Sequence, residues 1–118
     1  MKDLAPHILR QRLLIEGIYE RPVDVATVYE FFQVLAAGLG VTAAGDPIVN
    51  SSLGQGKLEN QGIEAFLPLI ESGVAIYTWQ SSRFISLIIY TCKSYDNDAA
   101  LAITSDFFKL SKIEYKAF

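Results

Sequence analysis

The chain has 118 residues, of which 51% are hydrophobic and 19% are charged, and its formal net charge is -3. This length and composition predict one domain, spanning residues 1–118, with a substantial hydrophobic core. The charges form no basic stripe, which argues against a nucleic-acid partner, and no apolar run reaches the roughly 18 to 20 residues that a membrane-spanning helix needs.

The N-terminal segment and the content of cysteine and histidine narrow the expectations further. Residues 1–10 are interpreted as an arm, and because they do not have the pattern of a signal peptide, a cytoplasmic location is expected. The chain has one cysteine, Cys92, and one histidine, His7, which excludes an internal disulfide and a zinc site built from the two. We interpret His7 as a solvated side chain, and we expect neither a metal nor a separately bound cofactor.

The first half of the chain predicts a strand, a helix and a short strand. Residues 12–19 are rich in strand formers and predict the first strand. Asp24 is the expected N-cap of a helix with an apolar stripe at Val25, Val28, Phe32, Leu35 and Leu39. Residues 41–50 predict a short, bent edge strand. The polar segment 51–62 predicts a flexible loop, because it lacks the Gly-Lys-Ser/Thr ending of a phosphate-binding loop.

The second half predicts three consecutive strands, a helix and a closing strand. Residues 63–70, 74–79 and 84–92 are joined by short connections, which favours antiparallel pairing. Asp96 begins a helix whose apolar stripe is Ala100, Ile103, Phe107 and Leu110. Apolar and charged residues alternate over residues 113–117 and predict the last strand. This order of elements predicts a two-layer α+β sandwich with a mainly antiparallel sheet and two helices on one face.

Three short motifs lie at the ends of the consecutive strands. Residues 71–73 read Glu-Ser-Gly, residues 77–81 read Tyr-Thr-Trp-Gln-Ser, and residues 90–92 read Tyr-Thr-Cys. Their order and spacing resemble those of the bacterial and archaeal S-adenosylmethionine decarboxylases, small proenzymes that cut their own chain between a Glu and a Ser. The corresponding sequences in that family are Glu-Ser-His, His-Thr-Trp-Pro-Glu and Phe-Thr-Cys. The resemblance covers roughly residue 12 to the C-terminus and implies the fold of that family.

The resemblance also implies a chemistry for the matching residues. Ser72 corresponds to the serine whose hydroxyl attacks the carbonyl of the preceding residue, here Glu71, to form an ester. A base then removes the Ser α-proton, and elimination and hydrolysis leave a pyruvoyl group, the covalent electrophile of the family's decarboxylation step in polyamine (spermidine) biosynthesis. Cys92 corresponds to the proton donor in decarboxylation, and Trp79 to a residue on the substrate side.

Several positions depart from the family's pattern. The histidine used in processing is Tyr77 here, and a phenol with a pKa near ~10 is a poor base at neutral pH. The histidine after the serine is Gly73, and the upstream serine that assists processing is Glu64. The Pro-Glu that faces the substrate is Gln-Ser at residues 80–81. The resemblance therefore implies a diverged member that stays uncleaved, lacks decarboxylase activity and binds a small molecule or a partner.

Two alternatives stay open at this point. One is an active pyruvoyl-dependent S-adenosylmethionine or amino-acid decarboxylase that cleaves itself between Glu71 and Ser72, with Glu64 or Tyr77 as base. The other is a structural partner of an active paralogue. Each matching residue also has an ordinary interpretation on its own, since Ser-Gly is a common turn dipeptide and a buried cysteine is usually a small hydrophobe. The high apolar content predicts self-association, most simply as a homodimer.

Overall fold

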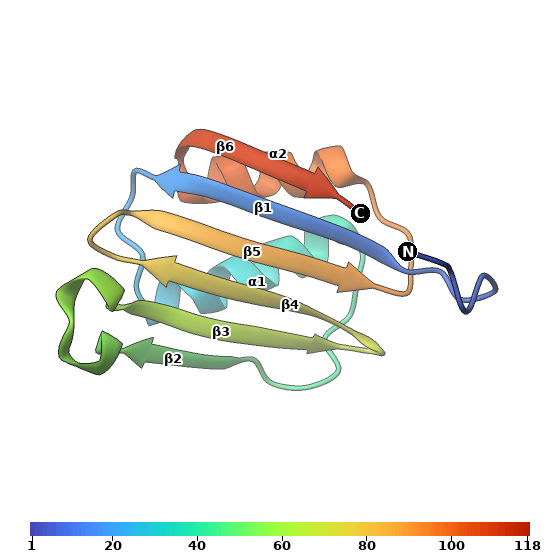
Figure 1. Ribbon diagram of the computed structural model, residues 1–118, viewed down its shortest axis with the longest axis horizontal. Helices are drawn as coiled ribbons and strands as arrows, with labels where there is room; N and C mark the ends of the chain where they lie inside the picture. Colours follow the sequence, from blue (N-terminus) through green and yellow to red (C-terminus); the bar gives the residue numbers. More distant parts are fainter.

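A six-stranded antiparallel sheet forms the frame of the structure, a computed structural model that describes residues 1–118 (Figure 1). The strands are β1 (Gln11–Tyr19), β2 (Ile48–Ser52), β3 (Gly62–Leu69), β4 (Ser72–Trp79), β5 (Phe84–Thr91) and β6 (Leu110–Ala117). Their order across the sheet is β2-β3-β4-β5-β1-β6, and every neighbouring pair is antiparallel. Strands β3, β4 and β5 form a meander, as their short connections predict.

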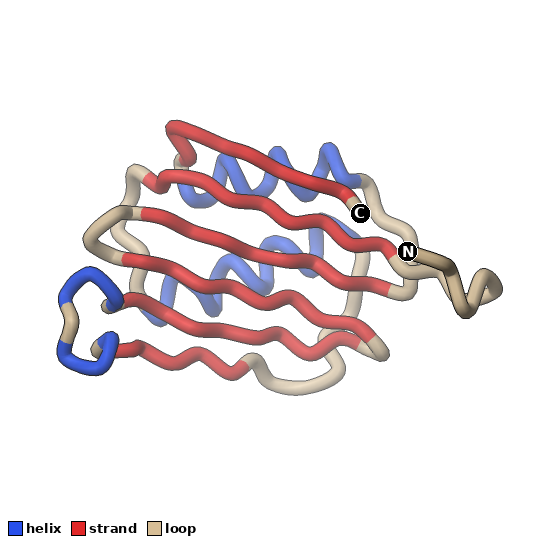
Figure 2. Tube along the Cα trace, in the orientation of Figure 1, coloured by secondary structure: helices blue, strands red, loops and turns tan.

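Two helices cover one face of this sheet, α1 (Val25–Leu39) and α2 (Asn97–Phe108), as Figure 2 shows. The predicted cap of α1 is confirmed: the Thr27 amide donates to the Asp24 carboxylate at 2.8 Å, and the Asp24 amide donates to the Thr27 hydroxyl at 3.3 Å. The helix ends at Gly40, whose φ of 68° places it in the left-handed region that glycine adopts without strain. The predicted α+β sandwich with both helices on one face is therefore confirmed.

The hydrophobic core lies between the helices and the inward face of the sheet. Alternate residues of β1, β3, β4 and β5 point into it, which is the period of two expected for strands with one buried face. The largest fully buried side chains include Leu13, Ile15, Phe31, Leu35, Ile76, Ile85, Leu87, Ile89 and Phe108. The rings of Phe31 and Phe108 meet with their centroids 4.6 Å apart and join the two helices.

The predicted helical stripes are partly confirmed. In α1, Val28, Phe32 and Leu35 are buried as predicted, and Phe31 is buried beside them. In α2 the fully buried side chains are Ala100, Thr104 and Phe108. The assignment of Leu110 to this helix is wrong, because the chain reverses at Lys109, with φ of 52°, and Leu110 begins β6.

Three further boundaries differ from the prediction. Strand β2 begins at Ile48 rather than residue 41, because residues 41–47 cross from α1 to the edge of the sheet and make only one isolated bridge, Ala43 with Leu69. The segment 51–62 is more ordered than a flexible loop, since it completes β2 and then forms two short 3-10 turns, Gly54–Gly56 and Leu58–Asn60. Strand β4 begins at Ser72, two residues before the predicted start.

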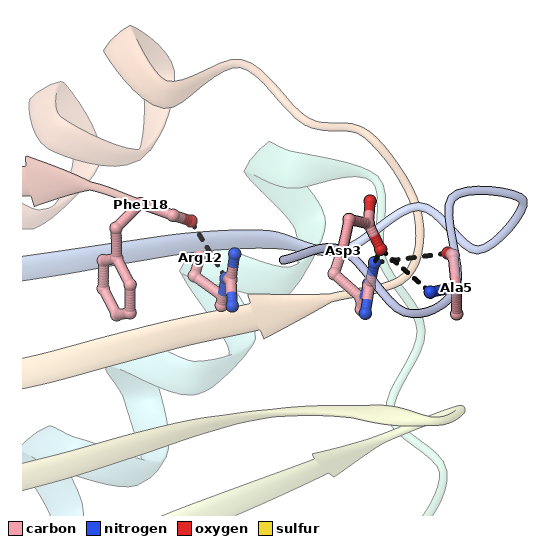
Figure 3. Close-up of polar contacts among 5 residues, drawn as sticks. Asp3, Ala5, Arg12 and Phe118 are labelled. Carbon is pink, nitrogen blue, oxygen red and sulfur yellow. Dashed lines mark hydrogen bonds and ion pairs between the residues drawn. The ribbon is translucent and has the colours of Figure 1, made fainter. Parts of the chain in front are cut away.

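Arginines near the start of β1 form hydrogen bonds with the N-terminal arm and with the C-terminus (Figure 3). In the arm, Arg10 forms an ion pair with Asp3 and also donates to the carbonyl of Ala5. The Ala5 amide and the Arg10 guanidinium lower the pKa of the Asp3 carboxyl. Arg12 donates to the carbonyl of Phe118 at 2.9 Å. His7 is exposed, as predicted.

The second face of the sheet carries no helix. Several large side chains on it are well exposed: Ile48 at 60%, Phe66 at 43%, Tyr77 at 46% and Tyr90 at 39%. We call this surface the open face, with Phe66, Tyr77 and Tyr90 at its centre. No helix of the structure has the length and apolar character needed to cross a membrane.

Candidate active site

The Glu-Ser corner is the tip of the hairpin between β3 and β4. Leu69 pairs with Ser72, so Ile70 and Glu71 form a two-residue turn. Glu71 has φ of 53°, in the left-handed region, which costs an L-residue about 1 kcal/mol. Its side chain is exposed, whereas that of Ser72 is half-buried at the first position of β4. The peptide bond that the family cleaves therefore lies at an exposed tight turn.

Ser72 and Cys92 meet although they are 20 residues apart. The Cys92 amide donates to the Ser72 Oγ at 3.0 Å, and the Ser72 hydroxyl donates to the Cys92 Sγ at 3.5 Å. The thiol in turn lies 3.6 Å from the carbonyl oxygen of Ile70. The two residues come together because β4 begins and β5 ends at the same edge of the sheet, as adjacent antiparallel strands do.

Gly73, the next residue, lies so close to the Phe66 ring that there is no room for a side chain. A Cβ atom at this position would lie 2.4 Å from the Cζ of Phe66, far inside van der Waals contact. The Phe66 ring therefore occupies the space that a side chain at residue 73 would need. A histidine at residue 73, as in the family's Glu-Ser-His corner, would fit only if this ring moved.

The remaining predicted site residues lie toward the other end of the same strands. Tyr77 pairs with Glu64 on β3 and with Ser86 on β5, and Trp79 packs against Phe84 with ring centroids 5.3 Å apart. Tyr77 is five residues along β4 from Ser72, about 17 Å at ~3.4 Å per residue. An odd offset along a strand also directs its side chain to the opposite face. Within one chain, neither Glu64 nor Tyr77 contacts Ser72, and their catalytic roles stay predictions.

A small pocket opens beside the Ser–Cys pair, where the end of α1 lies over the sheet. Its volume is about 290 Å³, and its lining is Gly40, Val41, Thr42, Leu69, Ile70, Ser72, Thr91, Cys92 and Lys93. Lys93 supplies the only charged side chain, and its ammonium donates to the carbonyl of Gly40 at 3.0 Å. We call this cavity the Ser72 pocket. Sequence reasoning missed Thr42, which the end of α1 brings to this pocket, and Lys93, which directly follows Cys92 in the chain.

A second pocket, of about 480 Å³, lies at the opposite end of the sandwich. It is lined by residues 23–26 at the start of α1, by residues 51–53 and 61–63, and by Thr78 and Gln80. Gly62 is required there, since a Cβ on it would lie 1.7 Å from the carbonyl oxygen of Thr78. The Thr78 hydroxyl accepts a hydrogen bond from the Ile63 amide at 2.9 Å. Neither Ser72 nor Cys92 lines this cavity.

These features define a class of protein: a small antiparallel sandwich that presents a Ser–Cys pair at the tip of a hairpin. The family model for S-adenosylmethionine decarboxylase matches residues 17–118, and the chain belongs to this family. A solved structure, that of the adenosylmethionine decarboxylase from Aquifex aeolicus VF5, shares the fold with a TM-score of 0.70 and 14% identity, over 94% of this chain and 89% of that chain. The comparison with curated proteins found no match. The family and fold predicted from the three motifs are thus confirmed.

The site provides some of what the family's pyruvoyl group requires. Ser72 is the residue that would supply the group, which when formed offers an electrophilic carbonyl. Cys92 lies in hydrogen-bond contact with Ser72, where a proton donor is needed. However, the groups in contact with the Ser72 hydroxyl are an amide N–H and a thiol, and neither is an imidazole or a carboxylate. Nor does the structure hold a cluster of three His, Cys, Asp or Glu side chains that could bind a metal ion.

Proposed function

We propose that this chain is an S-adenosylmethionine decarboxylase-like protein that remains uncleaved and has no decarboxylase activity. Its role is instead to bind a small molecule or a partner. The observation that carries the proposal is the environment of the Ser72 Oγ, whose hydrogen bonds are with the amide and the thiol of Cys92. The single histidine, His7, is exposed in the N-terminal arm, and no hydrogen bond joins it to Ser72.

Self-cleavage needs a proton acceptor at two points. When the Ser72 Oγ bonds to the Glu71 carbonyl carbon, its hydroxyl proton must reach the amide nitrogen as the peptide C–N bond breaks. The Ser72 α-proton must then be removed so that the ester C–O bond breaks and the backbone carboxylate of Glu71, the new C-terminus, leaves. A general base within reach typically contributes about 10² to 10⁴ in rate to such transfers. A thiol is a weak acceptor and an amide N–H is a donor, so the contacts of Ser72 do not supply this base.

The intact mass of the purified protein tests the proposal. We expect a single species of 13.1 kDa after long incubation at neutral pH, matching the whole chain. Two fragments that meet between Glu71 and Ser72, the second blocked by pyruvoyl, would refute it. The matched control is Ser72→Ala, which cannot form the ester and must give one species in either case.

One observation favours the alternative, an active pyruvoyl-dependent decarboxylase of polyamine biosynthesis. Ser72 and Cys92 match the family's nucleophile and proton donor, and their side chains are 3.5 Å apart. In that alternative, the base would come from outside the immediate contacts of Ser72. Release of carbon dioxide from carboxyl-labelled S-adenosylmethionine, dependent on Ser72, would establish it and overturn the inactive reading.

We further propose that the protein forms a homodimer through the open face. Phe66, Tyr77 and Tyr90 expose 43%, 46% and 39% of their surface there, on the adjacent strands β3, β4 and β5. Exposed apolar patches of this kind mark contact surfaces, and a two-fold axis would let the same patch cover itself. Light scattering coupled to size exclusion should give twice the chain mass. Tyr90→Lys should shift the mass toward the monomer, while Tyr115→Lys, at the edge strand, should not.

A further inference from the structure

We infer that the Ser72 pocket binds a small monocarboxylate, with the Lys93 ammonium as its counter-ion. This inference rests on the proposed ligand-binding role and names the class of ligand. It follows from three properties of the pocket that do not depend on one another: its charge, its supply of hydrogen-bond donors, and its size and apolar walls.

The charge of the lining favours a single negative charge on the ligand. Lys93 is the only charged residue among the nine that line the pocket, and no carboxylate is among them. Glu71, although next to Ser72 in sequence, points out at the exposed turn and does not line the cavity. The single positive charge of Lys93 would be neutralised by a ligand with one negative charge, and it would repel a cationic ligand.

The Lys93 side chain is exposed, and it reaches across to the end of α1. Its ammonium donates to the carbonyl of Gly40 at 3.0 Å, and the C-terminal end of a helix carries partial negative charge that holds a cation in place. An ammonium has three N–H donors, so this contact leaves two of them for a ligand. The contact with α1 therefore explains why Lys93 is placed at the pocket, and it leaves the charge available.

Two hydroxyls of the lining, those of Ser72 and Thr42, lack a strong acceptor within the chain, whereas the Thr91 hydroxyl donates to the Lys93 carbonyl at 2.7 Å. The Ser72 hydroxyl donates only to the Cys92 Sγ, at 3.5 Å, and sulfur is a weak acceptor. The hydroxyl of Thr42 makes no hydrogen bond within the chain, although Thr42 lines the same cavity. A carboxylate accepts through both of its oxygens, and can therefore take donors from Lys93 and from these hydroxyls together.

Size and apolar walls limit the rest of the ligand. The volume of about 290 Å³ is just below the range of about 300 to 1,000 Å³ usual for ligand pockets. Val41, Leu69 and Ile70 supply apolar surface suited to a short aliphatic chain. S-adenosylmethionine also has a carboxylate, but it is larger and carries an ammonium and a sulfonium, for which this lining has no carboxylate. A short-chain monocarboxylate satisfies the charge, the donors and the volume at once.

The test is a titration followed by NMR of the ¹⁵N-labelled protein, with butyrate as the probe. Butyramide has the same shape without the charge and is the matched ligand control, and S-adenosylmethionine is the competing class. Ionic strength is kept constant with sodium chloride. We expect saturable shifts of the Ser72, Cys92 and Lys93 amides with butyrate. Butyramide should bind at least about tenfold more weakly because the charge-assisted hydrogen bond is lost, and S-adenosylmethionine should do so because of its size and its two cationic groups.

Variants at Lys93 separate the pocket from general charge effects. Lys93→Gln should weaken butyrate binding about tenfold or more, while Lys93→Arg should retain it. Lys57→Gln removes the same charge from an exposed position in the 51–62 segment and should leave binding unchanged. The inference is overturned if butyrate gives no saturable shifts at the pocket, if S-adenosylmethionine binds more tightly than butyrate, or if Lys93→Gln folds and binds as the parent does.

The same samples keep this inference distinct from the proposed function. Intact mass is measured before each titration. A cleaved chain refutes the uncleaved proposal whatever butyrate does. An uncleaved chain that fails to bind butyrate refutes the monocarboxylate inference and leaves the proposal of an inactive, uncleaved protein standing. The comparison of butyrate with butyramide needs no variant, so it is decisive even if a Lys93 substitution unfolds the protein.

Discussion

The two ends of β4 carry the two halves of the family's motif, and they match the family to different degrees. At the first end, Ser72 and Cys92 match and are in contact, and Gly73 is the one departure. Toward the other end, Thr78 and Trp79 match, whereas Tyr77 and the residues at 80–81 do not. The two ends also differ in their pockets, one of about 290 Å³ with a lysine and one of about 480 Å³ with Asp24 as its only charged residue.

Three of the six residues that match the pattern form hydrogen bonds to backbone groups through their side chains. The Ser72 Oγ accepts from the Cys92 amide at 3.0 Å, the Thr78 hydroxyl accepts from the Ile63 amide at 2.9 Å, and the Thr91 hydroxyl donates to the Lys93 carbonyl at 2.7 Å. By contrast, Tyr77 is 46% exposed and makes no hydrogen bond. A change at such a position has little effect on folding, whereas a change at a backbone partner leaves a polar group unsatisfied. A match to the motif can therefore persist for structural reasons alone, without catalysis.

The largest expected difference in stability between the two ends of β4 comes from substituting the two crowded glycines, Gly62 and Gly73. Gly62→Ala places a Cβ 1.7 Å from a backbone oxygen at the far end, while Gly73→Ala places one 2.4 Å from the Phe66 ring at the Ser72 end. We expect the first to destabilise the fold by about 3 kcal/mol and the second by under about 1.5 kcal/mol, because a ring can swing and a strand cannot. Urea denaturation measures both. Equal costs would show that Phe66 is held as rigidly as the backbone.

The next effect compares a matching residue with its non-matching neighbour. Thr78→Val keeps the shape but leaves the buried Ile63 amide without its partner, at a cost of about 1 to 3 kcal/mol. Tyr77→Phe removes an exposed hydroxyl and should change the free energy of unfolding by under about 0.5 kcal/mol. Both are read from urea midpoints with unchanged slopes. A large loss for Tyr77→Phe would mean that its hydroxyl has a role that the single chain does not explain.

The fold was predictable where local signals agreed, and it was missed where a single residue reversed the chain. Asp24 and the stripe that follows it give α1 to within a residue, because capping and periodicity point the same way. The sequence predicts α2 as far as Leu110, because Lys109 gives no glycine-like signal of its left-handed conformation. The start of β2 was missed because its pairing partner, Phe66, is distant in sequence.

The site was predictable only in the part that depends on motifs. Ser72 and Cys92 were found by their spacing, and the structure brings them together. Glu64 and Tyr77 were placed by their positions in the family's motifs, and within one chain they lie away from Ser72, so their roles stay predictions. Thr42 had no sequence signal, since the end of α1 brings it to the pocket, and Lys93 follows Cys92 directly but belongs to none of the three motifs.

A smaller effect compares the serines at the two ends of β4. Ser72→Ala removes the acceptor of the half-buried Cys92 amide and should cost about 1 kcal/mol. Ser81→Ala, in the exposed turn after β4, breaks no hydrogen bond and should cost under about 0.5 kcal/mol. Thermal unfolding under identical conditions compares them. If Ser72→Ala is neutral, its hydroxyl is not needed for folding, and its match to the motif would favour a chemical role.

The smallest effect lies in the segment that leads from Cys92 to α2 and concerns Tyr95. Its backbone is held by Gln11, which accepts from the Tyr95 amide at 3.2 Å and donates to its carbonyl at 2.8 Å. The Tyr95 hydroxyl, however, is buried without a hydrogen-bond partner. Tyr95→Phe should therefore stabilise the fold by about 0.5 kcal/mol, the low end of the cost of burying an unpaired hydroxyl.

This prediction has a pH signature that an ordinary packing effect would lack. Burial raises the pKa of Tyr95 from 10.0 to about 12, so the folded state holds the phenol proton more tightly than the unfolded state. The contribution of this group to the stability of the parent protein is fully present below pH 10, and it is lost as the pH rises toward 12. The variant has no such group, so its advantage over the parent should grow between pH 8 and pH 11, about the span over which the unfolded phenol ionises. Urea denaturation of the parent and of Tyr95→Phe at pH 8 and pH 11 measures the difference in their free energies of unfolding. A difference that stays constant between the two pH values would show that the Tyr95 phenol is hydrated rather than buried.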